Sequence, residues 1–277
     1  PPSLAFVVYG VLADISIPRL FLAGVVPGLL QGAILMGYIL WVSRREGYSS
    51  GEDLPGREKV RRTLLAVPAL LIPVIVLGGL YGGFVTLTES AALSAVVAIL
   101  ASVFIYRGIK PAELLSVMAA AVRSAAVIMI IITTALAFGH WITETGAAAH
   151  AVKAVQSWGI SGWQFLLMIN LLLLVLGMFL EVFSVMLLVV PVIVPMLEPL
   201  GIDPIHFGVL LTINMEIGLL TPPVGLNLFV IANISKTPLA EVVRGTAPFV
   251  VLMLVLLLFI TYVPQVSTWL PNLLMSK

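Results

Sequence analysis

The sequence predicts an all-α, polytopic membrane protein whose helices are interrupted in places. Hydrophobic residues make up 61% of the 277 positions and charged residues 10%, whereas charged residues make up roughly 25% of an average soluble domain. Several uncharged stretches, among them residues 20–43, 63–88 and 245–276, reach the roughly 20 apolar residues that a membrane-spanning helix requires. A third observation is the pair Pro222 and Pro223 inside an apolar run, which no continuous helix accommodates. The lipid bilayer is therefore the expected surrounding of the chain.

Charge and cysteine content narrow the function. A net charge of +1 argues for no nucleic-acid partner, and the absence of cysteine excludes disulfides and thiolate metal sites. The sequence has no nucleophile–base pair, phosphate-binding loop or nucleotide motif, so it favours neither an enzyme nor an ATP-driven pump. The chain opens at Pro1 without an initiator methionine or the basic segment of a signal peptide, so we expect a fragment of a longer protein.

Basic residues set the expected orientation of the helices. They cluster in residues 44–62, at Arg107 and Lys110, and between Lys236 and Arg244, and the positive-inside rule places these clusters in the cytoplasm. Residues 140–162 and 198–206 then lie outside. In chain order we expect a short helix over 4–13, spanning helices over 19–42, 63–80, 88–106 and 111–139, a proline-containing segment over 163–197, a broken helix over 206–234 and a last helix over 245–263.

The segment 163–198 is expected to form a re-entrant hairpin. Pro191 and Pro195 share one face of residues 185–197, which as a helix would be about 20 Å long, short of the roughly 30 Å hydrocarbon core. Because both flanks are placed outside, the simplest path enters and leaves the membrane on one side, with its tip near residues 177–184. The alternative, that residues 163–180 cross the membrane, stays open at this point.

The broken helix holds the strongest candidate site, at Gly218–Asn227. Pro222 and Pro223 have no amide hydrogen, so the carbonyls of Gly218 and Leu219 are expected to lose their helical partners. Interrupted helices in membranes are tolerated where protein, water or an ion meets the freed groups, and they hold the ion and substrate sites of secondary transporters. Freed carbonyls suit a hard cation such as Na⁺, and the new helix N-terminus suits an anion. A proline kink without function is the alternative.

Glu181, at the proposed hairpin tip, is a second candidate. A carboxylate inside an apolar run is functional by default, but a solvated turn explains Glu181 equally well. Ser184 could cap the second helix of the hairpin, and Gly177 would let two backbones approach closely. Further upstream, Thr86 and Glu89 match a capping box, which predicts the start of a helix there.

The opening residues echo the double-proline region. Pro1-Pro2 is followed by Gly24 and Pro27, and Pro222-Pro223 is followed by Gly245 and Pro248 at the same spacing. Since the charge argument sends the two half-helices in opposite directions, we expect an inverted repeat of the kind found in alternating-access carriers. Residues 1–42 would end the first repeat, residues 43–63 would form a cytoplasmic basic loop, and residues 64–277 would form the second repeat. Most of the first repeat would then be missing from this chain.

Three motifs resemble a known family, the large membrane subunit of TRAP (tripartite ATP-independent periplasmic) transporters. They are residues 78–92, GGLYGGFVTLTESAA, residues 201–208, GIDPIHFG, and residues 221–225, TPPVG. The similarity runs along the chain, which resembles the C-terminal two thirds of that subunit. Leu87 stands where the family usually has proline and Ser90 where alanine is common, and both departures affect only the capping turn.

The resemblance implies a fold of the ion-transporter type, with two inverted repeats that each contain a hairpin and a broken helix. It implies Na⁺-coupled, elevator-type import of organic acids, such as C4-dicarboxylates or sialic acid, across the bacterial inner membrane. A periplasmic binding protein would deliver the substrate, and a small four-helix membrane subunit would brace the scaffold. A single-component Na⁺/dicarboxylate symporter of the same superfamily and a membrane scaffold that transports nothing are the alternatives.

The resemblance also implies site residues. The second Na⁺ site of the family corresponds here to Gly177, Gly218, Thr221 and Val224, and Pro2 would be a remnant of the first Na⁺ site. The hairpin tip and the break would frame the substrate, which places in its vicinity Glu181, Ser184, Pro222, Pro223, Gly225 and Asn227.

Overall fold

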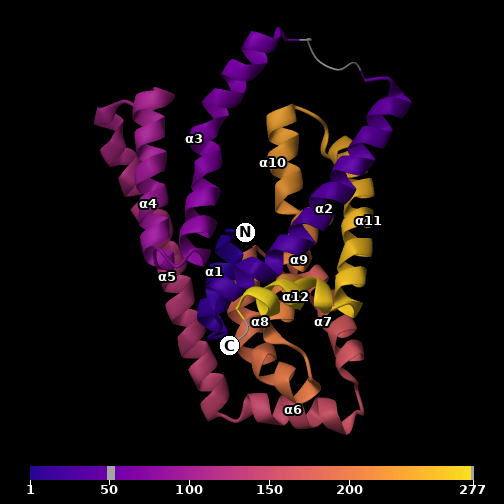
Figure 1. Cartoon of the computed structure of the whole chain (residues 1–277). Helices are drawn as coiled ribbons and strands as arrows, with labels where there is room; N and C mark the ends of the chain where they lie inside the picture. The colour runs from indigo at the N-terminus through magenta and orange to yellow at the C-terminus, as the bar shows by residue number, and fades with distance from the viewer. Residues whose placement is uncertain (49–53, 276–277) are drawn as a thin grey trace. The chain divides into compact units, whose positions relative to one another are not determined.

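The computed structural model of the protein describes residues 1–48 and 54–275, and every regular element in those ranges is a helix (Figure 1). Seven helical stretches of the described chain are long and apolar enough to cross a membrane. The prediction of an all-α, polytopic membrane protein is therefore confirmed. The seven stretches are Ile17–Glu46, Gly56–Tyr81, Leu87–Ile105, Pro111–Glu144, Gly162–Phe179, Val182–Leu200 and Leu239–Tyr262.

The chain divides into two compact units, which are described separately. The smaller unit consists of Ile39–Val127 together with Pro2. The larger unit consists of Pro1, Ser3–Tyr38 and Ile128–Lys277.

In the smaller unit, α3 (Gly56–Tyr81) packs along α4 (Leu87–Leu100), which continues into a π-helical turn over Ala101–Ile105. The Thr86–Glu89 capping box is confirmed. The amide of Glu89 donates to the hydroxyl of Thr86 over 3.3 Å, and the amide of Thr86 donates to the carboxylate of Glu89 over 2.7 Å. After a short 3-10 turn at Pro111–Glu113, α5 (Leu114–Glu144) leads out of this unit.

The predicted basic loop over residues 43–63 is mostly helical, which corrects the sequence expectation. Arg44 and Arg45 lie in the last turn of α2 (Ile17–Glu46), and the second half of the loop forms the first turns of α3. Arg, Lys and Glu are good helix formers, and Glu58 pairs with Arg62 one turn later over 3.1 Å. The centre of the predicted loop, residues 49–53, lies outside the described residues.

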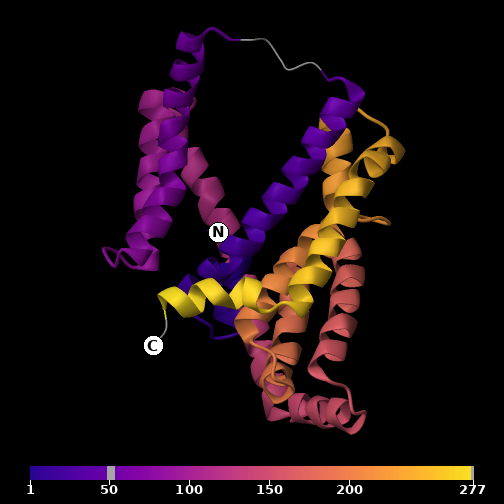
Figure 2. The same ribbon diagram turned by 45° about the vertical axis from the view of Figure 1, so that its right-hand side comes forward.

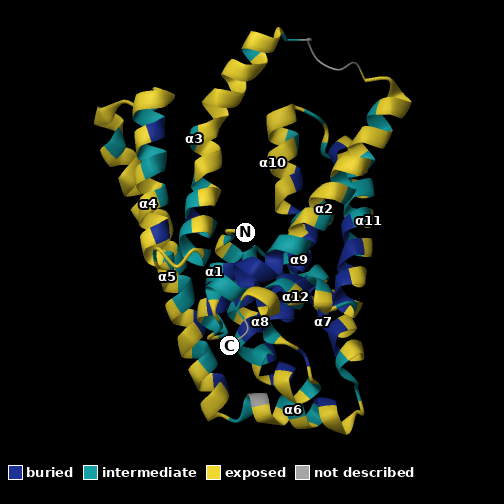
Figure 3. Ribbon diagram, in the orientation of Figure 1, coloured by how far each residue is buried: buried dark blue, intermediate teal, exposed yellow. Residues whose placement is uncertain are grey.

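The core of the larger unit surrounds α9 (Pro204–Leu219), which is buried along most of its length (Figure 3). It is contacted by helices α1 (Leu4–Leu12), α7 (Gly162–Phe179), α8 (Val182–Leu197) and α11 (Leu239–Tyr262). Gly208 is one reason for the close packing, because a Cβ there would lie 2.5 Å from the ring of Tyr9. The hydroxyl of Tyr9 donates to the carbonyl of Pro204 over 2.6 Å and fixes α1 to the start of α9.

Residues 162–197 form a helical hairpin. Helix α7 (Gly162–Phe179) and helix α8 (Val182–Leu197) are separated only by Leu180 and Glu181, inside the predicted tip. The outer ends of the hairpin meet, since a Cβ on Gly162 would lie 2.6 Å from the carbonyl oxygen of Leu200. The path of the chain agrees with the expected hairpin, and entry into the membrane from a single side stays a prediction.

The second interruption separates α9 from α10 (Leu226–Ser235), and α11 (Leu239–Tyr262) follows. The first residues show the same order of elements, with the short α1 followed by a turn and the long α2. Pro27 lies inside α2 and Pro248 inside α11, as the sequence echo suggests. The division of the chain into inverted repeats stays a prediction.

Two short helices were not expected from the sequence, α6 (Ala147–Ser157) and α12 (Gln265–Leu274). In Figures 1 and 2, both run across the direction of α7 and α11 within the larger unit. Each is short and has a polar as well as an apolar face, so neither has the long apolar run that marks a spanning helix in the sequence.

Candidate functional site

The two interruptions of the larger unit meet at a pair of glycines. A Cβ on Gly218 would lie 2.7 Å from both the Cα and the carbonyl carbon of Gly177. A Cβ on Gly177 would in turn lie 3.2 Å from the Cα of Gly218. The hairpin and the broken helix therefore touch backbone to backbone, at a distance that leaves no room for a side chain at Gly218 and little room for one at Gly177.

A backbone hydrogen bond also joins the hairpin tip to the break. The amide of Gly225 donates to the carbonyl of Met178 over 3.1 Å. Gly225 has a φ of +54°, in the left-handed region that side chains disfavour, and it directly precedes the first turn of α10. The segment 220–225 is thus tied to the hairpin at its last residue.

The carbonyl groups of the break are arranged differently from the sequence expectation. Pro222 and Pro223, joined by a cis peptide bond, do interrupt the helix. The carbonyl of Gly218, however, accepts the amide of Thr221 over 3.0 Å, because the chain tightens by one residue before the prolines. The Thr221 hydroxyl donates to the carbonyl of Ile217 over 2.6 Å, which leaves the lone pairs of its own oxygen available to accept.

The sequence-predicted site residues differ in how closely they gather. Gly177, Gly218, Thr221 and Gly225 come together as described above. Four others lie in or next to the interruption, where Val224 is half-buried and Pro222, Pro223 and Asn227 are exposed. Pro2 groups with the smaller unit, and its role as part of an ion site stays a prediction.

Glu181 caps α8, whereas the sequence suggested Ser184 for that role. Glu181 is the N-cap of α8, and its carboxylate accepts the amides of Ser184 over 2.8 Å and Phe183 over 3.1 Å. Ser184 does not cap the helix, because its hydroxyl donates to the same carboxylate over 3.0 Å. The carboxylate reaches the first-turn amides from outside the helix, a position that a residue inside the first turn lacks.

Sequence reasoning missed a buried polar network beside the glycine contact. Asn214 of α9 donates to the side-chain oxygen of Asn170 of α7 over 2.8 Å, and Asn170 donates to the hydroxyl of Thr261 of α11 over 2.8 Å. The three residues are 0%, 3% and 2% exposed. Asparagine inside an apolar helix was the available signal, but the pairing joins positions far apart in the chain.

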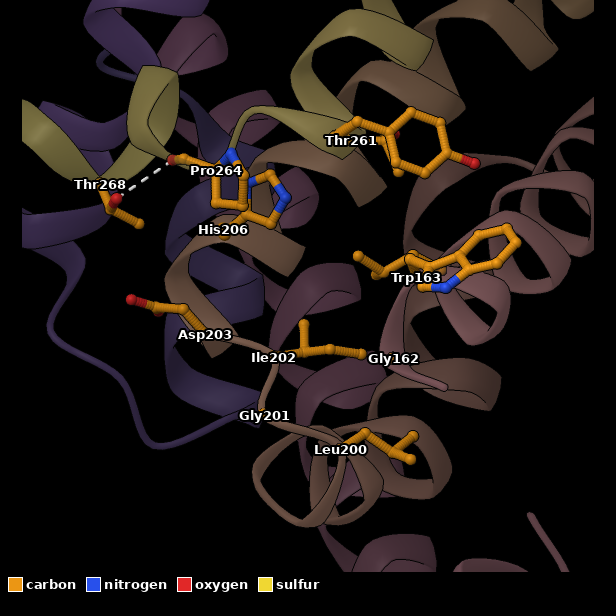
Figure 4. A pocket seen from close by; sticks show the side chains of 12 residues that line it. Gly162, Trp163, Leu200, Gly201, Ile202, Asp203, His206, Thr261, Pro264 and Thr268 are labelled. Atoms are coloured by element: carbon orange, nitrogen blue, oxygen red, sulfur yellow. Dashed lines mark hydrogen bonds between the residues drawn. The ribbon is translucent and has the colours of Figure 1, made fainter. Parts of the chain in front are cut away.

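A cavity of about 460 Å³ lies at the other end of the same helices, where α7 and α9 begin and α11 ends (Figure 4). Trp163, Asp203 and His206 line it, together with Thr261 from the buried network. Asp203 caps α9 through the amide of Ile205 over 2.7 Å. The ring nitrogen Nδ1 of His206 lies 3.3 Å from the hydroxyl of Ser267 and so attaches α12 to α9.

Comparison with known proteins adds an independent observation. Residues 1–266 match the family model described as "Tripartite ATP-independent periplasmic transporter, DctM component". The chain is 40% identical over 272 residues, 98% of its length, to the C4-dicarboxylate TRAP transporter large permease protein DctM of Pseudomonas aeruginosa, of which it covers 64%.

Two further relatives carry other substrate names. The chain is 37% identical to the isethionate TRAP transporter permease protein DctMQ of Oleidesulfovibrio alaskensis, over 96% of this chain and 42% of that protein. It is 35% identical to the sialic acid TRAP transporter permease protein SiaT of Haemophilus influenzae, over 99% of this chain and 44% of that protein. The chain thus spans less than two thirds of the length of each of these relatives.

Proposed function

Because the chain belongs to the DctM-component family of tripartite ATP-independent periplasmic transporters, we propose that it serves in the large permease of a Na⁺-coupled importer of organic acids. The observation that carries this proposal is the contact of two interrupted helical elements at Gly177 and Gly218. Interruptions of this kind, paired inside an apolar protein, supply the oxygen atoms and helix ends that ion-coupled carriers use.

The proposed Na⁺ site uses oxygen atoms from both elements. The backbone carbonyls of Gly177 and Gly218, the Thr221 hydroxyl and the carbonyl of Val224 are its ligands. Carbonyl and hydroxyl oxygens are the ligands that hard cations prefer. The Thr221 hydroxyl suits this role, because its proton is already directed at Ile217 and its lone pairs point elsewhere.

The substrate is proposed to bind beside the break, at the N-terminus of α10. The first amides of that helix follow Gly225, and the adjacent Asn227 adds a side-chain donor. A helix N-terminus attracts carboxylates through its free amides and its dipole. The N-terminus of α8 is a poorer choice, because Glu181 already occupies its first amides with a negative charge.

The energetics suit ion coupling. An inward Na⁺ gains about 2.3 kcal/mol per 100 mV of membrane potential, plus about 1.4 kcal/mol per tenfold gradient. Two ions would then supply roughly 7 kcal/mol, against roughly 2.3 kcal/mol for importing one negative charge. The difference would sustain accumulation of the acid by more than about a thousandfold.

The permease is proposed to work in a membrane together with two other proteins. We place the protein in the bacterial inner membrane, where a periplasmic binding protein delivers the acid and a small membrane subunit braces the permease during elevator-type movement. C4-dicarboxylates, sialic acid and isethionate are the first acids to examine, since relatives of similar identity carry these three names.

The test is uptake into proteoliposomes that contain the permease with its small subunit. Accumulation should require an inward Na⁺ gradient and the binding protein, and it should stop when K⁺ replaces Na⁺. Uptake without the binding protein would instead indicate a single-component symporter, and uptake without Na⁺ would remove the proposed coupling.

Thr221→Ala tests the ion site itself. Loss of the hydroxyl should raise the half-saturating Na⁺ concentration about tenfold, equal to 1.4 kcal/mol, because one ligand is gone. The control is Thr212→Ala in α9, the helix that leads into the break, since the Thr212 hydroxyl makes the same type of bond, to the carbonyl of Gly208 over 2.9 Å. An unchanged Na⁺ dependence in Thr221→Ala would remove this residue from the site.

A further inference from the structure

A chain of buried hydrogen bonds crosses three helices next to the glycine contact. Its order is α9, α7, α11: Asn214 donates to Asn170, and Asn170 donates to Thr261, each over 2.8 Å. Asn214 also donates to the carbonyl of Leu210 over 2.8 Å, and Thr261 donates to the carbonyl of Leu257 over 2.7 Å. Both ends of the chain are thus fixed to the backbones of their own helices.

The polarity of this chain is fixed by the groups around it. If the amide of Asn214 were turned over, its oxygen would face the carbonyl of Leu210 and the side-chain oxygen of Asn170, which are both acceptors. The hydroxyl of Thr261 uses its only proton on Leu257 and can serve Asn170 only as an acceptor. The observed orientation of the two amides therefore satisfies all four bonds, and it leaves the side-chain oxygen of Asn214 buried without a hydrogen-bond partner in the described structure.

The network lies close to the proposed Na⁺ site on the same two helices. Asn214 precedes Gly218 by one helical turn, about 6 Å along α9, and Asn170 precedes Gly177 by two turns, about 10 Å along α7. The Cβ position of Gly177 lies 3.8 Å from the backbone oxygen of Asn214 and 3.2 Å from the side chain of Met215. A shift of α7 along α9 would break the network, and it would at the same time move the Gly177 carbonyl away from the break.

We propose that Asn170 and Asn214 are positioning residues of the cation site, which hold the hairpin at the height where its tip oxygens meet those of the break. The inference rests on the proposed Na⁺ coupling. Most of the other residues that α7 and α9 bury are apolar, among them Leu173, Leu210 and Leu211, and apolar packing alone has little directional preference. The hydrogen-bonded side-chain amides supply the directional contact that fixes the position of α7 along α9.

A matched pair at Thr261 tests the proposal with little change of shape. Thr261→Val removes the oxygen that accepts from Asn170, whereas Thr261→Ser keeps it. Thr246→Val on the same helix is the control, because the Thr246 hydroxyl bonds only within α11, to Val242 over 2.9 Å and Val243 over 3.2 Å. Asn214→Leu removes the α9 end of the network, including the donor to Asn170.

The measurement is the melting temperature of the purified protein in detergent, titrated with NaCl at constant ionic strength with KCl. Asn214→Leu should raise the half-saturating Na⁺ concentration about tenfold, which corresponds to 1.4 kcal/mol, and Thr261→Val should raise it about threefold. Thr261→Ser and Thr246→Val should match the unmodified protein. The melting temperature in KCl alone gives the structural cost of each variant separately.

The outcomes separate this inference from the proposed function. If Na⁺ does not stabilise the unmodified protein, the proposed coupling fails and the inference fails with it. If Na⁺ stabilises the unmodified protein and Thr261→Val lowers the melting temperature in KCl without changing the Na⁺ midpoint, the network is only structural and the inference alone is overturned. Because Thr261→Val is a mild change, this result remains accessible even where Asn214→Leu does not fold.

Discussion

The contact between Gly177 and Gly218 leaves no room for a Cβ at Gly218. Adding a methyl group at Gly218 would place it 2.7 Å from the backbone of Gly177, so the hairpin and the break would have to separate. We expect Gly218→Ala to cost roughly 1–3 kcal/mol of stability, as other overpacked sites do. It should also abolish stabilisation by Na⁺, because the oxygens of the two elements no longer converge. Melting temperature in NaCl and in KCl measures both effects.

Gly245→Ala is the matched control for that variant. Gly245 lies inside α11, is exposed, and has no atom within 4 Å of the position that a Cβ would take. Alanine should therefore be neutral or stabilise the helix by roughly 0.5–1 kcal/mol, with the Na⁺ response unchanged. If both glycine variants behaved alike, the close approach at Gly218 would have no functional meaning.

Individual residues were predictable where their chemistry is local. Two adjacent prolines disrupt a helix wherever they occur, so the break could be placed from the sequence, and Gly177 and Gly218 were implied by the resemblance to the family. The Asn170–Asn214 bond spans 44 positions and the Asn170–Thr261 bond spans 91, and no spacing rule pairs residues so far apart. The capping role of Glu181 could not be assigned from the sequence, because the choice between Glu181 and Ser184 depends on the exact residue at which α8 begins.

Among the helical elements, α8 depends most visibly on a single cap. Glu181→Ala removes the acceptor for two first-turn amides and should cost roughly 0.5–2 kcal/mol of stability, whereas Glu181→Asp keeps a capping carboxylate and should cost less. The free energy of unfolding in mild denaturant measures the difference. A Glu181→Ala protein of normal stability whose KM for the organic acid is changed would indicate substrate contact in place of capping.

How well each helix was predicted depends on which signal in the sequence marks it. Long apolar helices were found because length and hydropathy are strong signals. Their ends were placed too early or too late where charged residues continue the helix, as at Arg44 and Arg45 in α2. The surface helices α6 and α12 were missed because each is short and amphipathic.

For the molecule as a whole, orientation in the membrane is the property that the basic clusters predict. The chain has no cysteine, so single-cysteine variants can be labelled without removing native ones. Ser157→Cys in α6 should react with a membrane-impermeant maleimide added outside, and Ser235→Cys at the end of α10 should react only after the membrane is opened. The reverse pattern would overturn the orientation, and equal labelling of both from outside would overturn the path of the broken helix.

At this scale, the class of the protein followed from composition and its family from three short motifs. The chain reversal near residues 177–184 was also predictable, because both flanks of the segment 163–197 were expected on the same side of the membrane. The packing of the larger unit around α9 was not, since it depends on close approaches such as that of Gly208 to Tyr9.

The hydrogen bond from the Gly225 amide to the Met178 carbonyl, 3.1 Å long, makes the amide proton of Gly225 a reporter of contact between the hairpin tip and the break. If the hairpin tip leaves the break whenever the site opens, that proton exchanges with deuterium only during the opening. The exchange rate at Gly225 then counts how often the site opens, and bound Na⁺ should slow it, whereas amides inside α11 should keep their rates.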